Sequence, residues 1–287
     1  MSIASFIISC IFGFLITYAM YLITSLFKRV EKKKILYEKE AVATSELDYG
    51  IVSNIGGRRN NEDSGAVLKV NEVVENKRLT AYIAAVADGA GGHKFGEVAS
   101  TLSISSVIDT LPSFVQLYLL RKYDDKSLMD KIYTAFKKAN SRILELRRKV
   151  SNEMIASTLS LGIIVKGKLF VGHVGDSAIF IYRPRERKLI KVTKDHSQNG
   201  VLYKAVGALE DIEPDIYAVN LIDGDIIILA SDGAIKYTGS TIPLEVLNMT
   251  QNPHELAELI VNTAYRSAIE QGRNPDNITV VVVKPKM

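Results

Sequence analysis

Apolar residues follow two different patterns along the chain. Short runs rich in β-branched residues recur through most of the sequence, separated by Gly, Asp or Asn turns, and predict strands. They lie at residues 51–55, 66–70, 79–87, 158–165, 168–174, 178–183, 189–193, 215–221, 225–230 and 277–283. Apolar residues at helical spacing predict helices at residues 95–110 and 127–150. In the second range, Ser127 and Asp130 stand at the positions of a capping box. A third helix is predicted between Pro253 and Gly272.

The order of these elements predicts the fold class. Strands occur in runs and helices gather between them, which favours an α+β domain built on antiparallel sheets over a doubly wound parallel sheet. We expect two antiparallel β-sheets packed face to face, flanked by helices and preceded by one transmembrane helix.

The first 27 residues contain no charged side chain. As a helix, residues 3–27 would be about 37 Å long, enough to cross a bilayer with some tilt. A cleaved signal peptide would begin with basic residues and have a shorter apolar region, so we predict a retained anchor at residues 1–27. The basic sequence KRVEKKK follows it and predicts a single-pass protein with its N-terminus outside and its globular part in the cytoplasm.

A charged juxtamembrane linker is predicted at residues 28–46 and one globular domain at 47–287. Residues 28–40 carry six basic and three acidic side chains, so they account for most of the formal net charge of +4. The remaining domain is nearly neutral, which argues against a nucleic acid partner. The single cysteine, Cys10, lies in the predicted anchor and excludes an intrachain disulfide and a cysteine-based zinc site.

Acidic residues recur beside the ends of predicted strands. The apolar run 79–87 ends at Asp88, and glycines follow it in the sequence VADGAGGH. The candidates are Glu62, Asp63, Asp88, Asp232 and Asp276. Each one alone reads as a cap or turn residue, but like charges that converge at the edge of a core are costly unless a cation lies between them. Oxygen ligands without cysteine or clustered histidine favour Mg²⁺ or Mn²⁺.

Six motifs occur in a fixed order: R-x-x-x-E-D, D-G-x-G-G-H, V-G-D-S, D-H-S, S-D-G and D-N-I-T. Together they resemble the metal-dependent serine/threonine protein phosphatases of the protein phosphatase 2C family over residues 50–283. The resemblance implies hydrolysis of phosphoserine and phosphothreonine in protein substrates, by a hydroxide that bridges two Mn²⁺ or Mg²⁺ ions and without a phosphoenzyme.

The resemblance also implies roles for individual residues. Asp88 would bridge two metal ions, with the Gly89 carbonyl as a further ligand. The remaining direct or water-mediated ligands would be Glu62, Asp232 and Asp276, with Asp63 behind them. Arg58 would hold the substrate phosphate, for which a planar guanidinium is suited, and Arg59 would be a solvated neighbour.

The other polar residues of the motifs have less defined roles. His93 would either protonate the leaving oxygen or orient a ligand. Glu153 stands near the position at which many relatives have an aspartate that binds a third metal ion. The resemblance therefore leaves open whether this chain binds a third ion. Asp176, His173 and His196 are interpreted as structural, in turns, caps or the sheet.

The chain departs from the family pattern at three places. Ala156 replaces a usual glycine, the sequence AIKY follows S-D-G in place of an apolar residue and an aspartate, and the short connection between His196 and Asp215 leaves no room for a mobile flap. Two alternative functions therefore stay open. One is a catalytically inactive relative that binds phosphoproteins or a partner enzyme, and the other is a hydrolase of another phosphoester.

Overall fold

The computed structural model of the chain describes residues 48–91, 95–150 and 154–286. The predicted anchor (1–27) and linker (28–46) lie outside the described residues, and so do His93 and Glu153.

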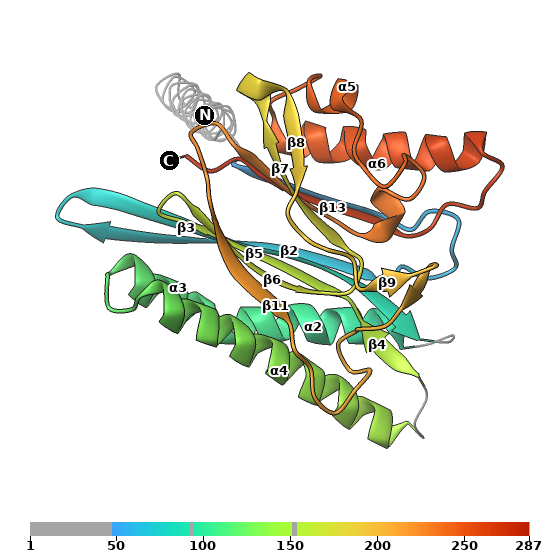
Figure 1. Cartoon of the computed structure of the whole chain (residues 1–287), viewed down its shortest axis with the longest axis horizontal. Helices are drawn as coiled ribbons and strands as arrows, with labels where there is room; N and C mark the ends of the chain where they lie inside the picture. The colour runs from blue at the N-terminus through green and yellow to red at the C-terminus, as the bar shows by residue number, and fades with distance from the viewer. Residues whose placement is uncertain (1–47, 92–94, 151–153, 287) are drawn as a thin grey trace, which may run out of the picture. The chain divides into compact units, whose positions relative to one another are not determined.

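Two antiparallel β-sheets form the centre of the domain (Figure 1). Sheet I contains, in spatial order, β1 (Tyr49–Asn54), β13 (Ile278–Val283), β12 (Ile226–Ala230), β7 (Ala178–Arg183) and β8 (Lys188–Lys191). Sheet II contains β11 (Asp215–Asn220), β6 (Lys168–Val174), β5 (Leu159–Val165), β3 (Lys77–Gly91) and β2 (Asp63–Val74), and β4 (Ile155–Ser157) pairs with the end of β3. The predicted arrangement of two antiparallel sheets is confirmed.

Helices cover the outer face of each sheet (Figure 1). Sheet II is covered by α2 (Gly96–Thr110), α3 (Pro112–Leu119) and α4 (Asp125–Lys149), and sheet I by α5 (Leu244–Leu247) and α6 (Pro253–Glu270). Short 3₁₀ helices lie at Pro184–Glu186 (η1) and Asp232–Ala234 (η2), and a small hairpin is formed by β9 (Ser197–Gln198) and β10 (Val201–Leu202). The layers are therefore helix, sheet, sheet, helix.

Strand β3 shows why the apolar run before Asp88 is continuous. Its alternate residues Tyr82, Ala84 and Val86 pack into the core between the two sheets. The residues between them, such as Ile83 and Ala85, pack against the helices on sheet II. Because both faces of the strand are buried, the sequence has no polar alternation until the strand reaches the cleft.

The helices differ from the sequence predictions at two places. Helix α4 begins earlier, because Asp124 is its N-cap and accepts hydrogen bonds from the Ser127 amide at 2.9 Å and the Ser127 hydroxyl at 2.6 Å. The predicted capping box at Ser127 and Asp130 is therefore wrong. Helix α3 was not predicted, and Pro112 in its first turn separates it from α2.

Among the described residues, Gly96–Leu119 is the stretch that is long and apolar enough to cross a membrane. It comprises helices α2 and α3, which pack on sheet II and contribute Ile104, Val107 and Val115 to its core. Part of its apolar character is explained by this burial, which includes 44% of the most apolar window.

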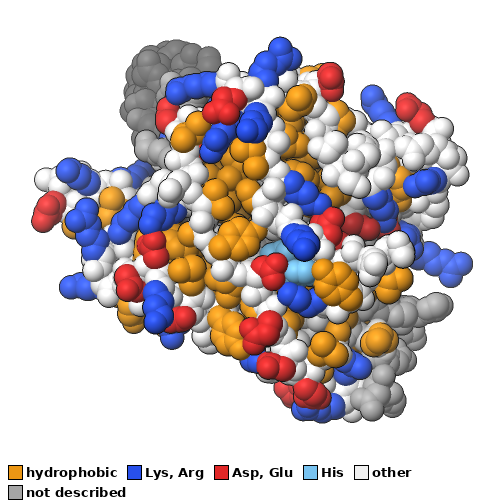
Figure 2. All heavy atoms as spheres, in the orientation of Figure 1, with side chains coloured by type: hydrophobic (Ala, Val, Ile, Leu, Met, Phe, Trp, Pro, Cys, Tyr) orange, Lys and Arg blue, Asp and Glu red, His pale blue; other side chains and the backbone are white. Residues whose placement is uncertain are grey.

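Charged side chains of both signs are interspersed on the face of the domain seen in Figure 2. Lysine and arginine lie beside aspartate and glutamate there, and no large field of one sign is visible on this face. The mixed pattern is consistent with the nearly neutral domain indicated by the sequence.

Candidate active site

A cleft of about 550 Å³ lies at one end of the two sheets. Strand β2 begins there, paired so that Asp63 faces Asp88 of β3, and β13 begins there at Ile278. The cleft is lined by Arg58, Arg59, Asn60, Glu62, Asp88, Gly89, Asp276 and Asn277. The structure thus brings together acidic residues from opposite ends of the sequence.

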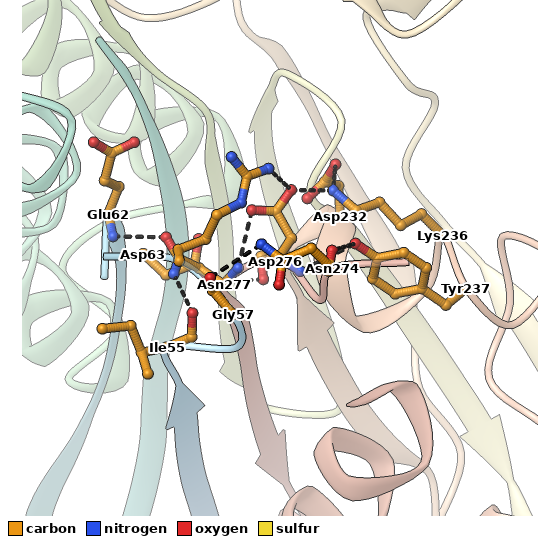
Figure 3. Close-up of polar contacts among 12 residues, drawn as sticks. Ile55, Gly57, Glu62, Asp63, Asp232, Lys236, Tyr237, Asn274, Asp276 and Asn277 are labelled. Atoms are coloured by element: carbon orange, nitrogen blue, oxygen red, sulfur yellow. Dashed lines mark hydrogen bonds and ion pairs between the residues drawn. The ribbon is translucent and has the colours of Figure 1, made fainter. Parts of the chain in front are cut away.

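The loop that carries Arg58 and Glu62 is held by Asn277 (Figure 3). The Asn277 side chain donates to the carbonyl oxygens of Ile55 at 2.8 Å and Asn60 at 3.0 Å, and it accepts from the Glu62 amide at 2.9 Å. Asn277 is buried, so these bonds fix the loop against the start of β13.

Thr158 forms two hydrogen bonds with the backbone of Asp88. The Asp88 amide donates to the Thr158 hydroxyl at 2.8 Å, and the Asp88 carbonyl oxygen accepts from the Thr158 amide at 2.8 Å. Burial, together with the surrounding carboxylates of Asp63, Asp232 and Asp276, raises the pKa of Asp88 well above its usual value. A carboxylate in this position lacks sufficient positive charge around it in the metal-free protein.

Two glycines allow the Glu62 carboxylate and the Gly89 carbonyl to come close together beside Asp88. A Cβ atom at Gly89 would lie 1.9 Å from the Gly96 carbonyl oxygen, so the end of β3 and the start of α2 are in close contact. A Cβ atom at Gly96 would lie 2.6 Å from the carboxyl carbon of Glu62 and 2.9 Å from the Gly89 carbonyl oxygen. The Glu62 carboxylate and the Gly89 carbonyl therefore converge on space that any larger residue at Gly96 would fill.

Asp63 lies below the cleft, where the two sheets meet. Its Oδ2 atom accepts from the Ser231 hydroxyl at 2.7 Å, and Ser231 in turn accepts from the Thr279 amide at 2.9 Å. Its Oδ1 atom is buried and forms no hydrogen bond to any described residue. Burial raises the pKa of Asp63 to about 7, although the hydrogen bonds from Ser231 and Thr279 oppose the shift.

Asp232 and Asp276 lie close together, with Lys236 between them (Figure 3). Asp276 lines the cleft, and Asp232 stands beside it but is not among the lining residues. The Lys236 ammonium lies 3.0 Å from Asp232 Oδ2 and also contacts Asp276 Oδ2. Arg58 donates to the same Asp276 oxygen at 2.8 Å. Burial alone would raise the pKa of Asp276, but Lys236 and Arg58 hold it below its usual value.

The sequence interpretation missed two residues of this cluster. Asp176, which was assigned to a turn, lies near enough to Asp232 for their charges to interact, and burial and that charge raise its pKa to about 6. It stands two residues after β6, so the signal used for Asp88, an aspartate at the end of an apolar run, would also have found it. Lys236 was noted only as part of AIKY, a departure from the family pattern.

His173 and His196 have the hydrogen bonds expected of structural residues. The His173 ring contacts the Ser160 hydroxyl at 2.9 Å and the Lys194 carbonyl oxygen at 3.1 Å. His196 lies 3.1 Å from Asp215 and accepts from the Gly175 amide at 3.2 Å. Both imidazoles are therefore satisfied away from the cleft lining.

The oxygen atoms of the cleft are suited to a hard divalent cation. Carboxylates and one main-chain carbonyl are the donors that Mg²⁺ and Mn²⁺ prefer. Burial and, after it, the charges of neighbouring carboxylates raise the pKa of Asp88, so a cation nearby would favour its ionised form. Within the described ranges, no three His, Cys, Asp or Glu side chains already form a closed set of ligands. The fit therefore rests on the type of donor and on the charge.

Comparisons with known proteins agree with this description. The family model described as protein phosphatase 2C matches residues 57–272. The chain is 26% identical over 247 residues to the serine/threonine phosphatase stp of Listeria welshimeri, covering 79% of this chain and 91% of that protein. It is 29% identical over 270 residues to the serine/threonine protein phosphatase PstP of Mycobacterium tuberculosis, covering 84% of this chain and 46% of PstP.

Solved structures show the same fold. The crystal structure of PstP from Mycobacterium tuberculosis has a TM-score of 0.65 at 27% identity, and the match covers 83% of this chain and 98% of that one. A structure of the PstP catalytic domain in complex with two manganese ions has a TM-score of 0.64 at 27% identity, covering 82% and 96%.

Proposed function

Because the chain belongs to the protein phosphatase 2C family, we propose that it hydrolyses phosphoserine and phosphothreonine in proteins with the help of two Mn²⁺ or Mg²⁺ ions. Its relatives with named activities are serine/threonine phosphatases, and one solved relative contains two manganese ions. The observation that carries the proposal is the convergence of Glu62, Asp88 and Asp276 with Arg58 on one cleft.

The acidic residues would divide into two groups. Asp88 would contact both ions, Glu62 and the Gly89 carbonyl would lie at one end, and Asp232 and Asp276 at the other. Asp63 would act from below, because its carboxylate bonds to Ser231, which directly precedes Asp232. When bound, the two ions supply a water molecule that is deprotonated at neutral pH and can attack phosphorus.

Arg58 would bind the phosphate that undergoes attack. Its side chain is 54% exposed at the rim of the cleft, and its ion pair with Asp276 directs the guanidinium over the acidic residues. A guanidinium can donate two parallel hydrogen bonds to phosphate oxygens. The attack breaks the bond between phosphorus and the serine or threonine oxygen and releases inorganic phosphate.

The test is hydrolysis of phosphoserine and phosphothreonine peptides by the purified protein, with Mn²⁺ and then with excess chelator. We expect release of phosphate with the metal and none with the chelator. Turnover that persists in excess chelator would contradict the metal mechanism. Tight phosphopeptide binding without turnover would indicate an inactive binding protein, and turnover of small phosphoesters alone would indicate another hydrolase.

The location of the enzyme at a membrane is a separate proposal. We infer it from the uncharged residues 1–27 and the basic flank that follows, all outside the described residues. An anchor would concentrate the enzyme beside membrane-bound substrates without any new contact. Protease added to intact cells should spare the domain, and its digestion there would contradict a cytoplasmic orientation.

A further inference from the structure

We propose that Lys236 is a built-in counter-ion of Asp232 and Asp276, which competes with the divalent ion at these two carboxylates and makes that ion the more weakly held of the two. The inference rests on the proposed function, because it assumes that Asp232 and Asp276 are metal ligands. It goes beyond that function by assigning the two ions unequal affinities and by naming the residue responsible.

The backbone places Lys236 beside Asp232. The Lys236 amide donates to the Asp232 carbonyl oxygen at 2.9 Å, in the turn that continues from η2. The side chain then returns over this turn, so that its ammonium lies 3.0 Å from Asp232 Oδ2. The ammonium is also 5.5 Å from the centre of the Tyr237 ring.

Tyr237 ties the same turn to Asp276. Its hydroxyl accepts from the Asp276 amide at 3.0 Å and donates to the Asn274 carbonyl oxygen at 3.3 Å (Figure 3). Gln271 donates from its side chain to the Tyr237 carbonyl oxygen at 2.7 Å. Lys236 and Asp276 are therefore held as neighbours although they are far apart in sequence.

The oxygen atoms of Asp276 are already engaged. Oδ2 accepts from both Lys236 and Arg58, and Oδ1 accepts from the Asn277 amide at 3.0 Å. A metal ion that binds Asp276 has to displace one of these donors or share an oxygen with a positive group. Either way the neighbouring ammonium charge opposes a second cation.

The opposite end of the cleft has a different electrostatic character. Asp88 lies directly opposite Asp63 in the β2–β3 pair, so two carboxylates stand next to each other there. The Glu62 carboxylate and the Gly89 carbonyl converge nearby. An ion at this end gains attraction from several acidic residues, so it should bind first and more tightly.

The experiment is a calorimetric titration of Mn²⁺ into the metal-free full-length protein without substrate. The wild-type protein should bind one ion tightly and a second more weakly. In Lys236→Met the weaker affinity should rise at least tenfold, and Lys236→Arg, which keeps the charge, should retain the weak affinity. Lys236→Gln serves the same purpose as Lys236→Met if methionine disturbs folding.

Lys191 provides a matched control. Like Lys236, it pairs with an aspartate four positions away in the chain and is similarly exposed. Its partner is Asp195, at 2.7 Å, whereas Lys236 pairs with Asp232 and Asp276. Lys191→Met should leave both Mn²⁺ affinities unchanged.

A second readout is thermal unfolding. Removal of the ammonium leaves Asp232 and Asp276 to repel each other, so Lys236→Met should melt at a lower temperature than wild type in chelator. Saturating Mn²⁺ should raise its melting temperature by more than it raises that of wild type.

The outcomes separate the two proposals. Two ions bound by Lys236→Met with wild-type affinities would overturn the counter-ion inference and leave the proposed phosphatase function intact. Failure of the wild type and every variant to bind Mn²⁺ would overturn the metal mechanism and the inference together.

Discussion

Asp63 makes the stability of the protein depend on pH. Its carboxylate is buried, and its pKa is raised to about 7. An unfolded aspartate titrates near 3.9, so between about pH 4 and 7 the folded protein binds more protons than the unfolded one. The free energy of unfolding therefore falls as the pH rises through this window, by at most about 4 kcal/mol from this residue.

Asp63→Asn should remove this contribution. In chelator, the variant should gain stability relative to wild type as the pH rises from 5 to 8, as measured by urea unfolding. His173, whose pKa is lowered to about 4 mainly by burial, has the opposite effect, because its neutral form is stabilising above the unfolded pKa of about 6.5. That effect is common to both proteins and cancels in the comparison. Parallel pH dependences would contradict the prediction.

Arg58 and Arg59 offer a comparison of adjacent side chains. Arg58→Ala should raise KM for a phosphopeptide by about tenfold or more and lower kcat less, because a charge-assisted contact to phosphate is lost from both ground and transition states. Arg59, which is exposed and lines the cleft, should tolerate alanine with little change. Steady-state kinetics on one phosphopeptide measures both. A larger loss from Arg59→Ala would mean that the two roles are exchanged.

At the residue scale, the sequence was informative where an acidic side chain stands beside the end or the start of an apolar run. That rule located Asp88 and Asp276 in the cleft, and consistent use of it would have included Asp176. It could not reveal the partners of Lys236. The contact with Asp276 depends on a turn and a loop separated by 40 positions in the chain, and no local pattern records such a contact.

At the scale of elements, the connection after His196 is anchored to a helix. Asn140 of α4 accepts from the Gly207 amide at 2.6 Å and donates to the Leu209 carbonyl oxygen at 3.0 Å. Arg147 donates to the Gly207 carbonyl oxygen at 2.6 Å. Gly207 has a φ of +83°, and a Cβ atom there would lie 2.2 Å from Ile143, so the loop and the helix pack directly.

Asn140→Ala should lower the free energy of unfolding by about 1–3 kcal/mol, because it leaves the buried Gly207 amide without its acceptor. Ser141→Ala is the control, since that exposed hydroxyl bonds only to Lys137 in its own helix among the contacts described. Chemical denaturation of the two variants gives the comparison. Equal stabilities would show that the loop contributes little to folding.

Element type was more predictable than element boundaries. Runs of β-branched residues identified the longer strands, because buried sheet positions require apolar side chains whatever their neighbours. The two- and three-residue strands β4, β9 and β10 were not predicted. The start of α4 was misplaced since two capping candidates, Asp124 and Ser127, lie three residues apart. Helix α3 was missed, because a helix of 8 residues gives little periodic signal.

At the scale of the whole molecule, the connection from His196 to Asp215 contains only the β9–β10 hairpin and the loop bound to α4. A peptide next to the phosphate would therefore meet few loops at the cleft, and most of its binding energy should come from the phosphate. Over a panel of unrelated phosphopeptides, kcat/KM should vary by less than about a hundredfold, or ~2.7 kcal/mol. A wider spread would point to a specificity surface elsewhere, and residues 114–123 are the first place to look.

The pairing of β1 with β13 has a further consequence for the architecture. Tyr49 faces Val283, and the Lys284 amide donates to the Asp48 carbonyl oxygen at 2.8 Å, so the beginning and end of the domain are neighbours. Both strands run between this point and the cleft, which lies at their other end. A short peptide linker could join residues 48 and 284, and new ends could be opened in the β2–β3 turn at Glu75 and Asn76. Such a circular permutant would keep every strand pairing around the cleft, while Glu62 and Asp63 would leave the ribosome after Asp276 instead of before Asp88.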